Sequence, residues 1–131
     1  MANNKYNLLI VEDEEYLIRV LRDNLTPRGC NVAFVRDGDE VIAYLENHTP
    51  DIVILDLLMP KHDGFYVLDA MKKNEKWKLI PVFVLSNLGE PQDIQRALNL
   101  GADDYFVKSH NTIFEVITRI MQILEKHKKG K

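Results

Sequence analysis

Short apolar runs alternate along the chain with longer segments in which apolar residues recur every three or four positions. Apolar runs of about four to eight residues between turn residues are typical of buried strands, whereas the wider spacing is typical of one face of a helix. The pattern therefore predicts strands at about 6–11, 31–35, 51–55, 80–85 and 104–107.

Each predicted strand is followed by a segment with helical spacing. The apolar positions that repeat in these segments are Leu17, Val20, Leu21 and Leu25; Val41, Tyr44 and Leu45; Phe65, Leu68 and Met71; Ile94, Ala97 and Leu98; and Ile113, Val116, Ile117, Ile120, Met121 and Leu124. The second helix is short, at roughly 38–47, and the fourth begins near Pro91, in a first-turn position, and stops at Gly101. Asn111 or Thr112 is suited to cap the fifth.

Strict alternation of five strands and five helices predicts an α/β fold, a five-stranded parallel sheet covered by helices on both faces. Its crossovers should be right-handed. Periodicity does not reveal the strand order. A doubly wound sheet of the flavodoxin-like type is the natural candidate, because its switch point would bring the ends of the first and third strands together.

Composition limits the kind of protein this is. The chain has 131 residues, 46% of them apolar and 28% charged, with a net charge of −3, which fits one globular domain over 1–131 with a core at about 5–124 and a basic tail at 125–131. No apolar stretch approaches the roughly 20 residues of a membrane span. Cys30 is the only cysteine, and its expected role is that of a small apolar filler. We expect a cytoplasmic protein without disulfides that contacts neither membranes nor nucleic acid directly.

Charged residues stand at the ends of three predicted strands. Asp56 ends the apolar run 52–55, Glu12 and Asp13 end the run 8–11, and Lys108 follows 105–107. Open α/β sheets place their chemistry at the carboxyl ends of the strands. Three acids and one lysine there suggest a divalent cation, a reactive carboxylate and a phosphoryl group. Because clustered carboxylates repel one another, at least one of them should have a raised pKa when no cation is bound.

Five segments in order carry a family resemblance. They are LIVEDE at 9–14, DIVILDLLMP at 51–60, DG at 63–64, IPVFVLS at 80–86 and GADDYFVK at 101–108. Over about residues 5–124 the chain resembles the receiver domain of two-component response regulators, the CheY-like superfamily. The resemblance implies the strand order 2-1-3-4-5 and phosphorylation of Asp56 by a cognate histidine kinase or phosphotransfer protein.

The resemblance also implies a Mg²⁺ site. Asp13 and Asp56 are the expected direct ligands, together with the backbone carbonyl of Leu58. Glu12 is one methylene longer than the acid often found at its position, so we expect it to act through a metal-bound water. Oxygen ligands and retained waters suit Mg²⁺.

Three further residues match family positions around the phosphoryl group. Ser86 would donate its hydroxyl to one phosphoryl oxygen, and Lys108 would place its positive charge at another. In the family, a hydroxyl residue and an aromatic residue on the fifth strand move together on phosphorylation. Ser86 and Tyr105 match this switch pair, although half-buried packing is the ordinary role of such a tyrosine.

The chain departs from the family pattern at three positions. Ser109 replaces the proline that commonly follows the lysine, so we expect a trans Lys108–Ser109 bond, since a cis bond without proline costs about 3 kcal/mol. Leu58 and Leu88 are apolar and flank the expected path of attacking water. We therefore expect slow self-dephosphorylation.

The expected function is that of a stand-alone phospho-switch that catalyses only its own phosphorylation and dephosphorylation. Its output should pass to a downstream protein through the surface formed by the fourth helix, fifth strand and fifth helix. Three alternatives remain: a pseudo-receiver that signals without phosphate, a hydrolase with an aspartyl nucleophile, and the detached receiver of a longer DNA-binding regulator. Retention of all five acceptor-site residues argues against the first alternative, and the lack of a general acid/base pattern argues against the second.

Overall fold

A computed structural model describes residues 5–59, 61 and 63–129 of the chain. The strands are β1 (Tyr6–Val11), β2 (Cys30–Val35), β3 (Ile52–Leu55), β4 (Val82–Ser86) and β5 (Asp104–Val107). The helices are α1 (Glu15–Leu25), α2 (Gly38–Asn47), α3 (Gly64–Lys73), α4 (Pro91–Asn99) and α5 (Ile113–Lys129), with short 3₁₀ turns η1 (Thr26–Arg28) and η2 (Lys108–His110). The predicted alternation of strands and helices is confirmed.

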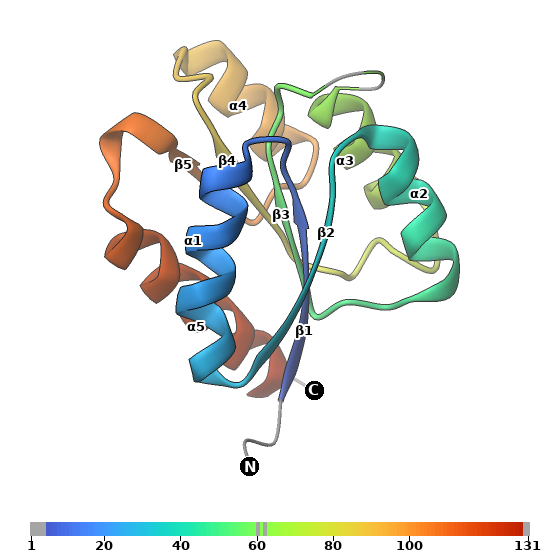
Figure 1. Ribbon diagram of the computed structural model, residues 1–131. Coiled ribbons are helices and arrows are strands. Elements are labelled where there is room, and N and C mark those ends of the chain that lie inside the picture. The colour runs from blue at the N-terminus through green and yellow to red at the C-terminus, as the bar shows by residue number, and fades with distance from the viewer. Residues whose placement is uncertain (1–4, 60, 62, 130–131) are drawn as a thin grey trace.

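The strands form one parallel sheet in the order β2-β1-β3-β4-β5. This is the doubly wound, flavodoxin-like arrangement, as the resemblance implied. In the register of the sheet, Val11 lies opposite both Val35 and Leu55, and Ser86 lies opposite Val107. The carboxyl ends of the strands therefore meet at one edge, which is the upper end in Figure 1.

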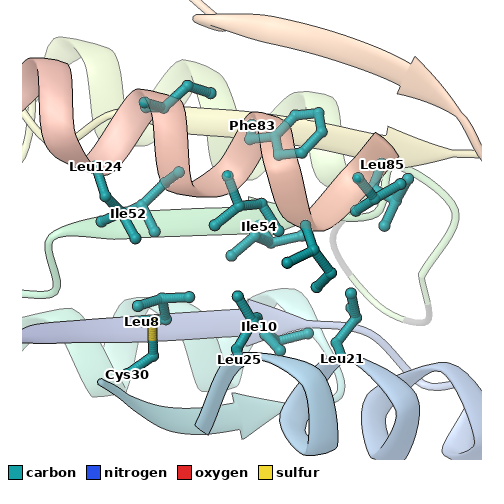
Figure 2. Close-up of a cluster of buried hydrophobic side chains, with 14 of the residues drawn as sticks. Leu8, Ile10, Leu21, Leu25, Cys30, Ile52, Ile54, Phe83, Leu85 and Leu124 are labelled. Carbon is teal, nitrogen blue, oxygen red and sulfur yellow. The ribbon is translucent and has the colours of Figure 1, made fainter. Parts of the chain in front are cut away.

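Two apolar layers enclose the sheet. One face packs against α1 and α5, and the other against α2, α3 and α4. Figure 2 shows the first layer, in which Ile10, Ile54 and Phe83 from neighbouring strands point toward α1 and α5. Both faces of β3 and β4 are buried, which explains why these strands read as continuous apolar runs.

Strand β4 begins and ends later than the sequence pattern predicted. The predicted strand covered 80–85, whereas the ladder runs from Val82 to Ser86. Pro81 has no N–H to give to a central ladder, and Ile80 is buried just before the strand. Ser86 belongs to the strand because it pairs with Val107.

Helix ends follow local side-chain chemistry. Thr112 caps α5 in a reciprocal arrangement: its Oγ1 accepts from the backbone N–H of Glu115 at 3.1 Å, and the Glu115 carboxylate accepts from the N–H of Thr112 at 2.8 Å. This is a capping box, and it decides between Asn111 and Thr112. Asp63 caps α3 by accepting from the N–H of Tyr66. None of the described helices is long and apolar enough to cross a membrane.

The buried Cys30 opens β2, with its Sγ 3.9 Å from Met121 Sδ. Burial raises the pKa of its thiol to about 11. A protonated thiol in contact with a thioether behaves as a small apolar group, so the predicted filler role is confirmed.

Candidate functional site

The sheet register brings the three predicted acids together. Glu12 and Asp13 follow the end of β1, and Asp56 follows the end of the neighbouring β3, where its N–H donates to the carbonyl of Val11 at 3.1 Å. One carboxylate oxygen from each acid lies within 4.8 Å of the others. Three hard oxygen donors at this spacing fit Mg²⁺, which takes carboxylates and retains water.

Asp56 is held on both of its carboxylate oxygens. The side chain is almost buried, with the residue 4% exposed. Oδ1 accepts from the backbone N–H of Leu58 at 3.0 Å, and Oδ2 accepts from Lys108 Nζ at 3.1 Å. These two contacts fix the direction in which the carboxylate points.

Lys108 is the positive centre of the site. Besides Asp56, its Nζ lies 2.9 Å from Glu12 Oε1 and 3.6 Å from Glu14 Oε1. Burial lowers the pKa of Lys108, but hydrogen bonds and charge from Glu12 and Asp56 outweigh burial and raise it above its ordinary value. The ammonium therefore stays charged at neutral pH.

Glu12 has a raised pKa, of about 6. Its residue is only 2% exposed, and loss of hydration is the main cause of the rise, partly offset by the hydrogen bond from Lys108. Repulsion from Asp56 adds to it. The predicted direction is confirmed, but burial contributes more than repulsion between carboxylates.

Ser86 and Tyr105 meet at the loop that follows β4. Ser86 is fully buried, and its Oγ accepts weakly from the N–H of Leu88 at 3.4 Å. The Tyr105 hydroxyl donates to the carbonyl of Leu88. Burial and the nearby charges of Asp93 and Asp56 raise the pKa of Tyr105 to about 12, so the phenol remains a donor. Ser86 and Tyr105, the predicted switch pair, thus both hydrogen-bond to the backbone of Leu88.

The loop between β3 and α3 closes tightly over Asp56. A Cβ on Gly64 would lie 2.5 Å from Leu57 Cα and 2.7 Å from the carbonyl oxygen of Asp56. Only glycine allows this approach, because it has no Cβ. The N–H of Gly64 donates to the carbonyl of Leu57. A hollow of about 400 Å³ beside the acids is lined by Asp13, Leu57, Leu58, Met59 and Asp63. Leu58 is half exposed at its edge, with 51% of its surface accessible.

The family model for the response regulator receiver domain matches residues 8–121. The chain belongs to the response regulator receiver family. The probable transcriptional regulator ycf27 of Cyanophora paradoxa is 36% identical over 126 residues, which cover 96% of this chain and 51% of that protein. This receiver thus spans about half the length of the curated relatives that it matches.

Solved structures agree with the fold of this receiver. The signal receiver domain of a signal transduction histidine kinase from Syntrophus aciditrophicus is 31% identical, with 93% of this chain and 92% of that chain covered and a TM-score of 0.85. The phosphorylated cyanobacterial phytochrome response regulator RcpA is 33% identical, with coverages of 92% and 89% and a TM-score of 0.76.

The structure brings most of the predicted site residues of this receiver into one cluster, and adds contacts that the sequence did not reveal. Glu14, the third acid near Lys108, was not predicted, and neither was the Leu88 carbonyl as the partner of Tyr105. The described residues contain no cis peptide bond, so the predicted trans Lys108–Ser109 bond is confirmed. Pro60, the last residue of the motif at 51–60, lies outside the described residues.

Proposed function

We propose that this chain is a phosphoacceptor receiver domain that takes a phosphoryl group onto Asp56 from a histidine kinase or a phosphotransfer protein. The observation that carries the proposal is the position of the Asp56 carboxylate between a cluster of acids able to hold a cation and the ammonium of Lys108. We further propose that the described fold acts as a single receiver domain with its core at about 5–124.

Asp56 supplies the nucleophile. One of its oxygens forms a bond to phosphorus as the bond from phosphorus to the donor's imidazole nitrogen breaks, and the imidazole keeps the electron pair. The hydrogen bond from Leu58 N–H and the contact with Lys108 orient the carboxylate before the donor arrives. Phosphoryl transfer depends mainly on such positioning and on neutralising charge.

The cation would be held by Asp13 and Asp56, by the carbonyl of Leu58, and by Glu12 through a water molecule. Bound Mg²⁺ would neutralise charge on the transferring group and on the acids. Lys108 Nζ now contacts Oδ2 of Asp56. Once Asp56 carries the phosphoryl group as an acyl phosphate, this ammonium would pair with one phosphoryl oxygen. Ser86 would donate its hydroxyl to another.

The proposed output begins at Ser86. When its hydroxyl turns toward the phosphoryl group, the weak bond to the N–H of Leu88 is lost, and the loop that also accepts from Tyr105 must rearrange. Helix α4 follows this loop. The surface formed by α4, β5 and α5 would therefore change and contact a downstream protein.

A receiver of a longer DNA-binding regulator is the second candidate for the full protein. The ycf27 relative is named a probable transcriptional regulator and is about twice as long as the matched region. The receiver chemistry proposed here is the same in either setting, since all of its residues lie within the described fold.

Beryllofluoride, which mimics a phosphoryl group on an aspartate, provides the test. Amide spectra should be recorded with beryllofluoride alone, with Mg²⁺ alone and with both. We expect the resonances of 56–59, 86–90 and 105–109 to shift to new positions only when both are present, and no such change in Asp13→Ala. An unchanged spectrum with both reagents, or an equal response in Asp13→Ala, would contradict the proposal.

A further inference from the structure

A groove of about 620 Å³ lies at the end of the sheet opposite Asp56. It runs between the segment that leads into β4 and the last turns of α5, and the start of β3 contributes to it. In Figure 1 this is the lower end of the molecule, where β1 begins and α5 ends. We call it the amino-end groove. Strand β3 separates the two regions, because Asp51 lines the groove and Asp56 lies at the far end of the strand.

Apolar side chains line part of the amino-end groove. Ile80 and Pro81 precede β4, and Ile123 lies on α5; all three line the groove with only a small part of their surface exposed. Leu79 is 79% exposed. A lone exposed leucine is ordinary on a protein surface. This one adjoins three other apolar residues in a concave site, where an apolar side chain from outside would lose contact with water.

The two acids in the groove already have partners within the fold. The Asp51 carboxylate accepts from the N–H of Asn7 at 2.7 Å, and the Asp103 carboxylate accepts from the N–H of Val82 at 2.7 Å. Each holds the start of a strand in place. Lys72 Nζ also lies 3.7 Å from the Asp103 carboxylate and offsets its charge. Asp51 keeps its negative charge, so an acidic ligand would have to place its carboxylates at the lysines and away from Asp51.

The two lysines of the groove have no charged partner among the described residues. Among the described residues, no acid lies within ion-pair distance of Lys76 or Lys126. Lys76 belongs to the wall before β4 and Lys126 to α5, so the two charges come from different walls. Arg119 also lines the groove, but it pairs with Asp104. The positive charge that the groove offers to a ligand is therefore that of the two lysines, one on each side of it.

We propose that the amino-end groove binds an acidic segment of a partner protein. An apolar side chain of that segment packs against Leu79 and Ile123, and carboxylates on either side of it pair with Lys76 and Lys126. The chemistry fits a peptide with apolar and acidic residues. A contact with a second copy of this chain is the other occupant that the test below distinguishes.

This inference goes beyond the phosphoacceptor function. The groove and the acceptor site lie at opposite ends of the strands, so a partner held in the groove leaves Asp56 open to a phosphoryl donor. The groove also lies away from the hollow beside Asp13. Partner binding and phosphorylation can therefore be measured separately, and failure of one proposal does not imply failure of the other.

The test uses a fluorescent synthetic peptide with one leucine between blocks of glutamates, and a matched peptide with glutamines. Binding should be followed by anisotropy and by amide shifts of the complete chain. We expect saturable binding of the glutamate peptide, with shifts confined to residues 49–51, 76–81 and 119–127, and at least tenfold weaker binding of the glutamine peptide.

Charge-matched variants locate the site. Lys76→Glu with Lys126→Glu should weaken binding at least tenfold, and Leu79→Ser should weaken it without any change of charge. Arg19→Glu with Arg22→Glu, on exposed positions of α1, makes the same change in net charge elsewhere and should bind as wild type. Labelling by acetyl phosphate should be unchanged in all variants, which shows that they fold.

Three outcomes would overturn the proposal. The first is equal weakening by both charge variants, which would mean attraction by overall charge. The second is the absence of saturable binding at millimolar peptide. The third is movement of the same amides with protein concentration in the absence of peptide, which would make the groove a contact between copies of this chain.

Discussion

The ammonium of Lys108 lies 3.1 Å from a carboxylate oxygen of Asp56, although 52 residues separate them in the chain. The two residues follow β5 and β3, which are not neighbours, since β4 lies between them. The long lysine side chain spans this gap. Residues that follow two non-adjacent strands of the sheet thus meet at the site.

Removing Lys108 should destabilise the fold. Lys108→Met would leave Glu12 and Asp56 buried without a positive partner, and breaking a buried ion pair in this way costs about 3 kcal/mol. The matched control is Lys73→Met, which removes an exposed pair with Asp69 and should cost less than about 0.5 kcal/mol. Urea unfolding without Mg²⁺ measures both. Equal free energies of unfolding for the two variants would contradict this account of the site.

Binding of Mg²⁺ should depend on pH through Glu12. Its pKa is about 6 in the folded protein and 4.5 ordinarily, so between these values the folded state holds more protons than the unfolded chain. Without metal, this group therefore makes folding less favourable as pH rises through that window. With metal, protons compete for the site, and the rise in Tm with millimolar Mg²⁺ should be larger at about pH 7.5 than at about pH 5.

Glu12→Gln cannot gain or lose this proton and serves as the control. Its response to Mg²⁺ should be smaller and should vary less between the same two pH values. A wild-type Tm that does not respond to Mg²⁺ at either pH would argue against a cation site at these acids.

Gly64 should be among the least replaceable residues of the acceptor loop. In Gly64→Ala the new Cβ would lie 2.5 Å from Leu57 Cα, so the backbone must shift at a cost of about 3 kcal/mol. Gly89→Ala is the matched control, because its Cβ would lie at ordinary contact distance from its nearest neighbours, 3.6 Å from a side-chain atom of Val107 and 3.9 Å from the carbonyl oxygen of Asn87. Thermal unfolding should show a large loss of stability for the first and little change for the second. Equal losses would show that the close approach at Gly64 is unimportant.

Much of this architecture was predictable because it is specified locally. Buried parallel strands appear as apolar runs, and the ends of such strands share one edge, so Asp56, Glu12 and Lys108 were expected to meet. The direction of the Glu14 side chain was not predictable, because it depends on the conformation of the loop after β1. The hydrogen bond from the Tyr105 hydroxyl to the carbonyl of Leu88 was not predictable either, because every residue has a backbone carbonyl and the sequence does not indicate which one accepts.

The sequence pattern also did not fix the exact ends of every strand. Periodicity could not distinguish 80–85 from 82–86 as the fourth strand, because every residue in the run is apolar up to Ser86. The proline at 81 was the available signal, since proline cannot donate to a central ladder. The Lys76 and Lys126 pair illustrates a further limit, because the two residues share a groove only through the packing of α5.

The phosphorylated state should be long-lived. Hydrolysis needs a water in line with the bond from Asp56 to phosphorus, and polar side chains can orient such a water. Leu58 and Leu88 cannot do so, and both belong to loops that adjoin the site. Leu58→Asn with Leu88→Glu should therefore speed the decay of phosphorylated protein, which can be followed after removal of acetyl phosphate. Unchanged or slower decay in the single and double variants would show that the leucines do not shield the bond.

The most direct test of the central claim is phosphorylation of Asp56→Asn beside Asp63→Asn. Both substitutions remove one carboxylate from the same loop region, and asparagine at 63 retains the cap of α3. After incubation with acetyl phosphate and Mg²⁺, intact-mass measurement should show one added phosphoryl group on wild type and on Asp63→Asn, and none on Asp56→Asn. Base-labile labelling that persists in Asp56→Asn would place the acceptor elsewhere and contradict the account.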